Sequence, residues 1–106
     1  MSEPLNNMQV NETNDESRPY ILRLFVTGAS INSLRAVNNL TEICDKHLNG
    51  QYTLEIIDVY QQKILAEKEN IIALPLLIKS FPLPERRMVG DMSDTPKVLK
   101  GLGLSN

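Results

Sequence analysis

The chain has 106 residues, the length of one domain, and its 42% hydrophobic and 23% charged residues are typical of a globular protein. A net charge of −2 excludes a general affinity for nucleic acid or anionic lipid. The single cysteine, Cys44, excludes an intrachain disulfide and a CxxC redox pair, and with only one histidine, His47, the sequence predicts no metal or other cofactor.

The first 18 residues are polar and acidic, and they lack the apolar stretch of a secretion signal. Their carboxylates are Glu3, Glu12, Asp15 and Glu16. Because so few apolar side chains can be buried there, we predict a disordered acidic tail over residues 1–18 and one folded domain over residues 19–106. The longest uncharged apolar run, residues 71–78, is too short to cross a bilayer, so we expect a cytoplasmic protein without membrane contact.

Two segments in the first half have the pattern of β-strands. Residues 20–27 are nearly continuous in hydrophobicity, with Arg23 as the only charged residue, which predicts a central strand buried on both faces. Residues 52–59 alternate and then become fully apolar, which predicts a second strand. A helix lies between the two segments, so the strands are expected to run parallel, and a short helix over residues 61–70 follows them.

The helix between these strands is predicted over residues 32–48. Its apolar residues recur at steps of three and four and form one stripe: Leu34, Val37, Leu40, Cys44 and Leu48. Ser30 or Asn32 is expected to cap its start, and Asn49-Gly50 supplies a left-handed stop at its end. This helix is therefore expected to cover one face of the sheet.

The second half is organised around Pro75, which lies inside an apolar run. Proline cannot donate a hydrogen bond inside a central strand, so Pro75 is expected at the entrance of a strand, as a candidate cis-proline. Residues 79–84 are predicted to form the turn of a hairpin and residues 86–90 its returning strand. Ser93 or Asp94 is expected to cap a last helix. The order β-α-β, helix, hairpin and helix predicts an α/β thioredoxin-like domain.

The positions that would carry redox chemistry in this architecture hold hydroxyl groups. In redox-active members the first helix starts with CxxC, and the helix N-terminus lowers the pKa of the thiol. Here Ser30 and Ser33 occupy these degenerate redox positions, and serine cannot carry out thiol–disulfide exchange. A hydrolytic serine would need a base, but His47 lies at the far end of the same helix, and Cys44 is interpreted as a core residue. We therefore expect no enzymatic activity.

A basic group, Lys79, Arg86 and Arg87, surrounds the proline-rich turn and indicates either a partner surface or a solvated hairpin tip. Together with its surroundings it resembles the KaiB family of clock-associated proteins over residues 20–104. The matching pieces, in chain order, are Leu22–Gly28, Asn32–Ala36, Ile57–Val59, Leu65–Glu67, Pro75, Lys79, Pro82–Pro84, Arg86-Arg87, Gly90–Asp94 and Lys97–Leu99.

The resemblance implies a non-enzymatic regulator that docks on a KaiC-type hexameric ATPase, in circadian timing or a related stress or output role. It also implies that the C-terminal half can adopt a second, fold-switched packing that self-associates as a dimer or tetramer. Carried over residue by residue, the candidate partner-binding residues are Arg35, Leu65, Ala66, Glu67, Lys79, Arg86 and Arg87.

Two other functions remain open from the residues alone. One is a redox-inactive thioredoxin-like protein that binds an extended peptide or glutathione beside Pro75 in oxidative stress. The other is an oligomeric scaffold. Binding to an ATPase partner would favour the regulator, whereas saturable glutathione binding without such a partner would favour the first alternative.

The composition of the tail generates a stability prediction. Truncation before Pro19 should leave the thermal midpoint nearly unchanged, because residues 1–18 bury little apolar surface. The measurement is thermal unfolding of the full and truncated chains. A fall of more than about 5 °C, on the order of 1 kcal/mol for a domain of this size, would contradict the prediction.

Overall fold

The computed structural model describes residues 18–104, so most of the predicted acidic tail lies outside the described residues. Four strands form one mixed sheet in the order β2-β1-β3-β4. Strands β1 and β2 are parallel, as predicted, while β3 runs antiparallel to both β1 and β4. The strands are β1 (Tyr20–Val26), β2 (Tyr52–Asp58), β3 (Leu76–Phe81) and β4 (Arg86–Val89).

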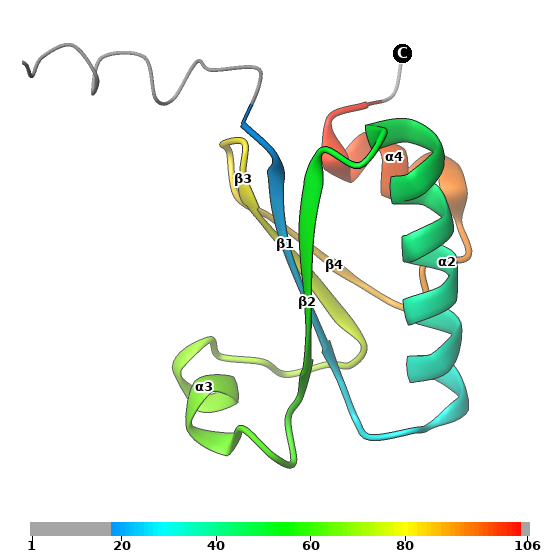
Figure 1. The fold of residues 1–106 in the computed structure, drawn as a ribbon. Helices are drawn as coiled ribbons and strands as arrows, with labels where there is room; N and C mark the ends of the chain where they lie inside the picture. The colour runs from blue at the N-terminus through cyan, green and yellow to red at the C-terminus, as the bar shows by residue number, and fades with distance from the viewer. Residues whose placement is uncertain (1–17, 105–106) are drawn as a thin grey trace, which may run out of the picture.

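Three helices cover the two faces of this sheet (Figure 1). They are α2 (Ile31–Leu48), α3 (Lys63–Lys68) and α4 (Thr95–Leu102). Helices α2 and α4 pack on one face, where their apolar residues join a core cluster that includes Leu22 and Leu24 of β1. The lobe that carries α3 packs on the other face against a second cluster around Phe25 and Ile57. None of the helices in residues 18–104 is both long and apolar enough to cross a membrane.

Helix α2 starts at Ile31, one residue before the predicted start, and its buried stripe differs from the prediction in the first two turns. Ser30 caps the helix, because its side chain accepts a hydrogen bond from the Ser33 amide at 3.2 Å. The buried residues are Ser33, Ala36, Leu40, Ile43, Cys44 and Leu48. Leu34, which was predicted to be buried, is 50% exposed. The reason is that the Thr27 amide, just after β1, donates to Ser33 Oγ at 3.0 Å and so turns Ser33 inward instead.

The second half differs from the prediction at the hairpin. The Leu74–Pro75 bond is cis and immediately precedes β3, and two further X-Pro bonds, before Pro82 and Pro84, are also cis. Strand β3 extends to Phe81, so Lys79 is a strand residue and not part of the turn. Its side chain is 3% exposed, and its ammonium group donates to the carbonyl oxygen of Pro82 at 2.8 Å. The hairpin loop is therefore tied back onto its own strand.

Helix α4 closes the α2 face of the sheet. Asp94 caps it by accepting from the Lys97 amide at 3.3 Å, and Gly103 ends it with a φ of 81°. Gly101 lies inside the helix, and a Cβ atom at this position would overlap the sulfur of Met88. Close packing between α4 and β4 thus depends on glycine here. The Tyr20 hydroxyl donates to the Leu102 carbonyl oxygen at 3.0 Å and joins the start of β1 to the end of α4.

Candidate functional site

The lobe around α3 exposes large apolar side chains that have no cover among residues 18–104. Tyr60 is 67% exposed, Ile64 73% and Ile72 96%, and we call these three residues the α3 surface. A shallow depression of about 660 Å³ runs along the helix and is lined by Tyr60, Gln61, Gln62, Lys63, Ile64, Leu65 and Lys68. Exposed apolar residues rimmed by charged ones are typical of a protein-binding surface.

Helix geometry explains why these residues face outward. Leu65 and Ile71 pack against the second core cluster. Consecutive residues in a helix or a tight loop cannot point the same way, so the neighbouring Ile64 and Ile72 are left in solvent. The sequence analysis did not name these residues as site residues. A signal was present in the sequence: Ile64-Leu65 and Ile71-Ile72 are adjacent apolar pairs, and only one member of each pair can be buried.

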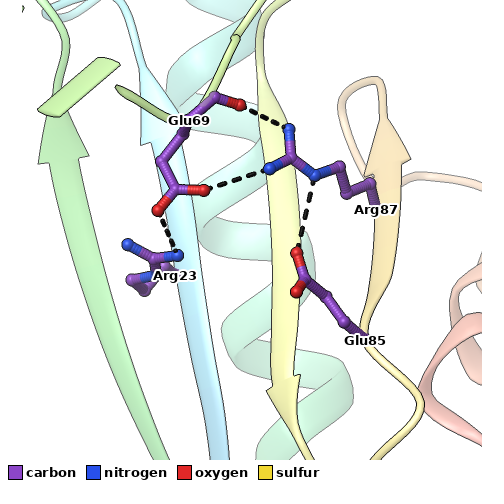
Figure 2. A network of polar contacts seen from close by, with 4 residues as sticks. All are labelled: Arg23, Glu69, Glu85 and Arg87. Atoms are coloured by element: carbon purple, nitrogen blue, oxygen red, sulfur yellow. Dashed lines mark hydrogen bonds and ion pairs between the residues drawn. The ribbon is translucent and has the colours of Figure 1, made fainter. Parts of the chain in front are cut away.

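Glu69 holds the end of α3 against the sheet through two arginines (Figure 2). Its carboxylate contacts Arg23 Nη2 at 2.9 Å and Arg87 Nη2 at 3.0 Å, and Arg87 Nη1 also donates to the Glu69 carbonyl oxygen at 2.8 Å. A weaker contact joins Arg87 Nε to Glu85 at 3.6 Å. The arginines lie on β1 and β4 and are aligned through Ile78 of β3, so Glu69 bridges across three strands.

This network is partly buried, so solvent and salt screen its charges less than those of a fully exposed ion pair. The Arg23 and Glu69 side chains are only 22% and 23% exposed, and that of Arg87 is 38% exposed. Glu69 is also the C-terminal cap of α3, where a cation is favourable because the last carbonyl groups carry partial negative charge. The short helix expected over residues 61–70 gave no sign of this role, because the two arginines that contact Glu69 lie far from it along the chain.

The structure separates the predicted partner-binding residues into two groups. Leu65 and Ala66 are half-buried and Glu67 is exposed on α3, and Arg87 reaches the end of the same helix through Glu69. Arg35, in contrast, is exposed on α2 in the other layer. There, hydrogen bonds from Ser93 lower the pKa of Asp91, and the charge of Arg35 adds to this effect.

Lys79 and Arg86 belong to the α2 face and not to the α3 surface. Lys79 on β3 lies opposite Arg86 on β4 and opposite Leu22 on β1, so the three residues form one row across the sheet. Burial lowers the pKa of Lys79, and the nearby charge of Arg86 lowers it further. Because Lys79 is buried and bonded to Pro82, it does not offer a free ammonium group to a partner in this conformation.

The degenerate redox positions form a hydroxyl cluster at the start of α2. Ser30 Oγ and Ser33 Oγ are 2.9 Å apart, and Thr27 Oγ1 lies 3.2 Å from Ser30 Oγ. These contacts cap the helix and anchor it to β1. Burial, aided by the charge of Asp45, raises the pKa of Cys44 to about 12, so its thiol is protonated at neutral pH. Within residues 18–104 no group of three His, Cys, Asp or Glu side chains could hold a metal ion.

Comparison with known proteins identifies the relatives of this chain. A KaiB domain model matches residues 23–104. The circadian clock oscillator protein KaiB of Prochlorococcus marinus is 49% identical over 87 residues, which cover 82% of this chain and 83% of the relative. The N-terminal domain of Synechococcus elongatus SasA superposes with a TM-score of 0.69 at 23% identity, covering 87% of this chain and 90% of that domain.

The fold extends to thioredoxins. The germline-specific thioredoxin Deadhead of Drosophila melanogaster superposes with a TM-score of 0.65 at 13% identity, over 83% of this chain and 81% of that one. The predicted α/β thioredoxin-like fold is therefore confirmed. At this level of identity the likeness concerns the fold alone.

The Glu69 network predicts a local loss of stability when its charge is removed. Glu69→Gln leaves Arg23 and Arg87 without their shared counterion, so the free energy of unfolding should fall by roughly 1.5–3 kcal/mol, the range for hydrogen bonds to charged groups. Amides of residues 63–72 should also exchange hydrogen faster. Glu67→Gln is the matched control, because Glu67 is exposed on the same helix. Equal effects of the two substitutions would contradict the proposed role of Glu69.

Cys44 is predicted to be unreactive in the folded chain. A rise in pKa from 9.0 to about 12 leaves about a thousandfold less thiolate, so a disulfide reagent at pH 8 should label the native thiol far more slowly than the denatured one. Folded stability should decrease as the pH rises from 9 towards 12, because the unfolded chain releases this proton first. Insulin reduction that disappears in Cys44→Ser would refute the expectation of no redox activity.

Proposed function

This chain belongs to the KaiB family, and we propose that it is a non-enzymatic regulatory protein that docks on a KaiC-type hexameric ATPase. Membership of the family supports this class of partner. The exposed α3 surface is the observation that supports the mode of contact, because Ile64 and Ile72 leave apolar area in water that a partner would cover.

The α3 surface has the composition of a protein–protein contact. Apolar and aromatic side chains lie at its centre, and Lys63, Glu67 and Lys68 are exposed around them. Such a centre contributes most of the binding energy when it is desolvated, while the charged rim contributes orientation and selectivity. The Glu69 network supports this role, because it holds α3 in one position before the partner arrives and so reduces the entropy lost on binding.

The proposed role is regulation without catalysis. The hydroxyl cluster at the start of α2 is engaged in capping the helix, and its hydroxyl groups donate and accept among themselves and with the backbone. We infer that the protein acts in clock-like timing or in a related stress or output response by occupying the ATPase. The self-associated, fold-switched packing remains a prediction of the family resemblance, and the arrangement described here is the thioredoxin-like one.

Aspartate substitutions on the α3 surface test this proposal. Ile64→Asp combined with Ile72→Asp should weaken binding to a KaiC-type ATPase by at least about tenfold, the effect of losing 1.4 kcal/mol at an interface. The measurement is surface plasmon resonance against the immobilised ATPase, with and without ATP. The fold should be unaffected, because both side chains are exposed.

Ile31→Asp is the matched control, because Ile31 is 65% exposed at the start of α2, where a carboxylate is compatible with the helix. This variant should bind like the wild type. Unchanged binding of the double variant would exclude the α3 surface as the contact. A wild-type chain that shows no affinity for the ATPase but saturable affinity for glutathione would instead favour the glutathione-binding alternative.

A further inference from the structure

A second surface, separate from the α3 surface, gathers positive charge between β4 and α4. It is a cleft of about 250 Å³, which we call the β4–α4 cleft, lined by Arg86, Arg87, Met88, Lys97, Lys100 and Gly101. Four of these six residues are cationic, and no carboxylate is among them. A hollow with this lining attracts anions.

Secondary structure brings three of the cations to one place. Lys97 and Lys100 lie three residues apart and therefore share one face of α4. Side chains alternate along β4, so Arg86 lies on the same side as the buried Met88, towards α4. The fourth cation, Arg87, reaches the other face and joins the ion-pair network there. The result is one strand cation and two helix cations around the same cleft.

The floor of the cleft is apolar and closely packed. Met88 is 8% exposed and belongs to the core cluster beneath α4, and a Cβ atom at Gly101 would overlap its sulfur. Charges that lie over such a floor interact more strongly than charges surrounded by water, because the local dielectric constant is lower. An anion on this floor would therefore be attracted by the three cations more strongly than on an open surface.

These three cations have no anionic partner in the described part of the chain. Within residues 18–104 no carboxylate forms an ion pair with Arg86, Lys97 or Lys100. Two acids that are close along the chain are engaged elsewhere, because Glu85 contacts the neighbouring arginine and Asp94 caps α4. Positive charge is thus left uncompensated around the cleft.

A buried lysine adds to this charge from within the sheet. Lys79 lies opposite Arg86 on β3, and its ammonium group is bonded to a backbone carbonyl oxygen and not to a carboxylate. Burial lowers the pKa of Lys79, and the charge of Arg86 lowers it further, so the two cations repel each other. An anion bound beside Arg86 would reduce this repulsion.

The geometry favours phosphate groups over other anions. Arginine presents a planar fork of donors that fits a phosphate through two parallel hydrogen bonds, and lysine adds point charges around it. A volume of about 250 Å³ is below the range of about 300–1,000 Å³ for pockets of drug-sized ligands, so the cleft suits a short phosphate chain and not a whole nucleotide. Three cations on two elements also match the several charges of linked phosphates better than the single charge of a carboxylate.

We propose that the β4–α4 cleft binds an oligophosphate chain through Arg86, Lys97 and Lys100. Arg86 holds the chain from the strand side, and the two lysines hold it from the helix side. The chain can belong to inorganic polyphosphate or to a nucleotide whose base and sugar stay in solvent, because only the phosphates enter the cleft. This site goes beyond the proposed function, and its binding tests contain no ATPase.

Nuclear magnetic resonance titration of the full chain with inorganic tripolyphosphate tests the site. Saturable shifts are expected for the amides of residues 86–88 and 97–101. At matched ionic strength the affinity should decrease from tripolyphosphate to pyrophosphate to orthophosphate, because each lost phosphate removes a partner of the cations. Salt at about 1 M, where the screening length is about 3 Å, should largely abolish the shifts. Shifts spread over all lysine-bearing surfaces would mean general ion screening and would overturn the proposal.

Removal of the two helix cations provides the matched comparison. Lys97→Gln combined with Lys100→Gln should weaken tripolyphosphate binding by at least about tenfold, the effect of losing hydrogen bonds to charged groups. The control is Lys63→Gln combined with Lys68→Gln, which removes two lysines that line the depression on α3. All four lysines are exposed, so both variants should fold, and the control should bind like the wild type. Equal weakening of the two variants would contradict the proposal.

Two further variants separate charge from shape. Lys97→Arg combined with Lys100→Arg keeps both charges and should retain binding of tripolyphosphate. Arg86→Gln should weaken it by at least about tenfold, because the cleft loses its bidentate donor. Arg86 is exposed, and unchanged amide resonances away from the cleft would show that this variant is folded. Wild-type affinity of a folded Arg86→Gln chain would refute the assigned geometry.

Other ligands identify the source of the anion. ATP, added without divalent cations, and long-chain polyphosphate should both shift the amides of residues 86–88 and 97–101, and the tighter of the two identifies the source of the chain. A hexaglutamate peptide should bind more weakly than tripolyphosphate. Equal or tighter binding of the peptide would assign the cleft to an acidic peptide and overturn the proposal. Because the ATPase is absent, such a failure would leave the proposed function intact.

Discussion

Strand β1 is hydrogen-bonded along both edges and covered on both faces, and the position of every other described element follows from it. Its parallel partner β2 requires a crossover, which α2 provides, and its antiparallel partner β3 is followed directly by the hairpin to β4. Leu22 and Leu24 face α2 and α4, and Phe25 faces the α3 lobe. A strand in this position must be apolar at nearly every residue, as residues 20–26 are.

Arg23 is the charged exception in this strand, and it explains how a helix of six residues keeps its place. A helix this short is not stable by itself, and none of the residues of α3 is fully buried. A partly buried arginine on β1 requires a counterion, and Glu69 provides it at the end of α3. Arg87 on β4 contacts the same Glu69 carboxylate. Electrostatics and the packing of Leu65 thus position the lobe together, and this position determines which apolar side chains remain in solvent.

Arg86 and Arg87 show how one pair of adjacent residues can serve two surfaces. Because side chains alternate along a strand, Arg87 joins the network behind the α3 surface, and Arg86 lies on the same side of β4 as Met88, towards α4. A basic cluster in the sequence is thereby divided between two faces of the sheet. The α3 surface is apolar, whereas the space between β4 and α4 is lined by cationic side chains. The two surfaces can therefore be occupied by different groups.

Local patterns in the sequence were sufficient for the order of elements, the parallel β1–β2 pair and the thioredoxin-like class, because hydrophobic period acts over a few residues. For the caps of α2 and α4 the sequence left two candidates each, and the structure selects Ser30 and Asp94. Only the tertiary structure decided that Ser33 and not Leu34 faces the core, that Lys79 is buried, and that Glu69 is a bridge and not a solvated residue. Each of these outcomes depends on how one element packs against another, which the local hydrophobic pattern does not contain. Likewise, Arg86, Lys97 and Lys100 come together only after β4 and α4 have packed against each other.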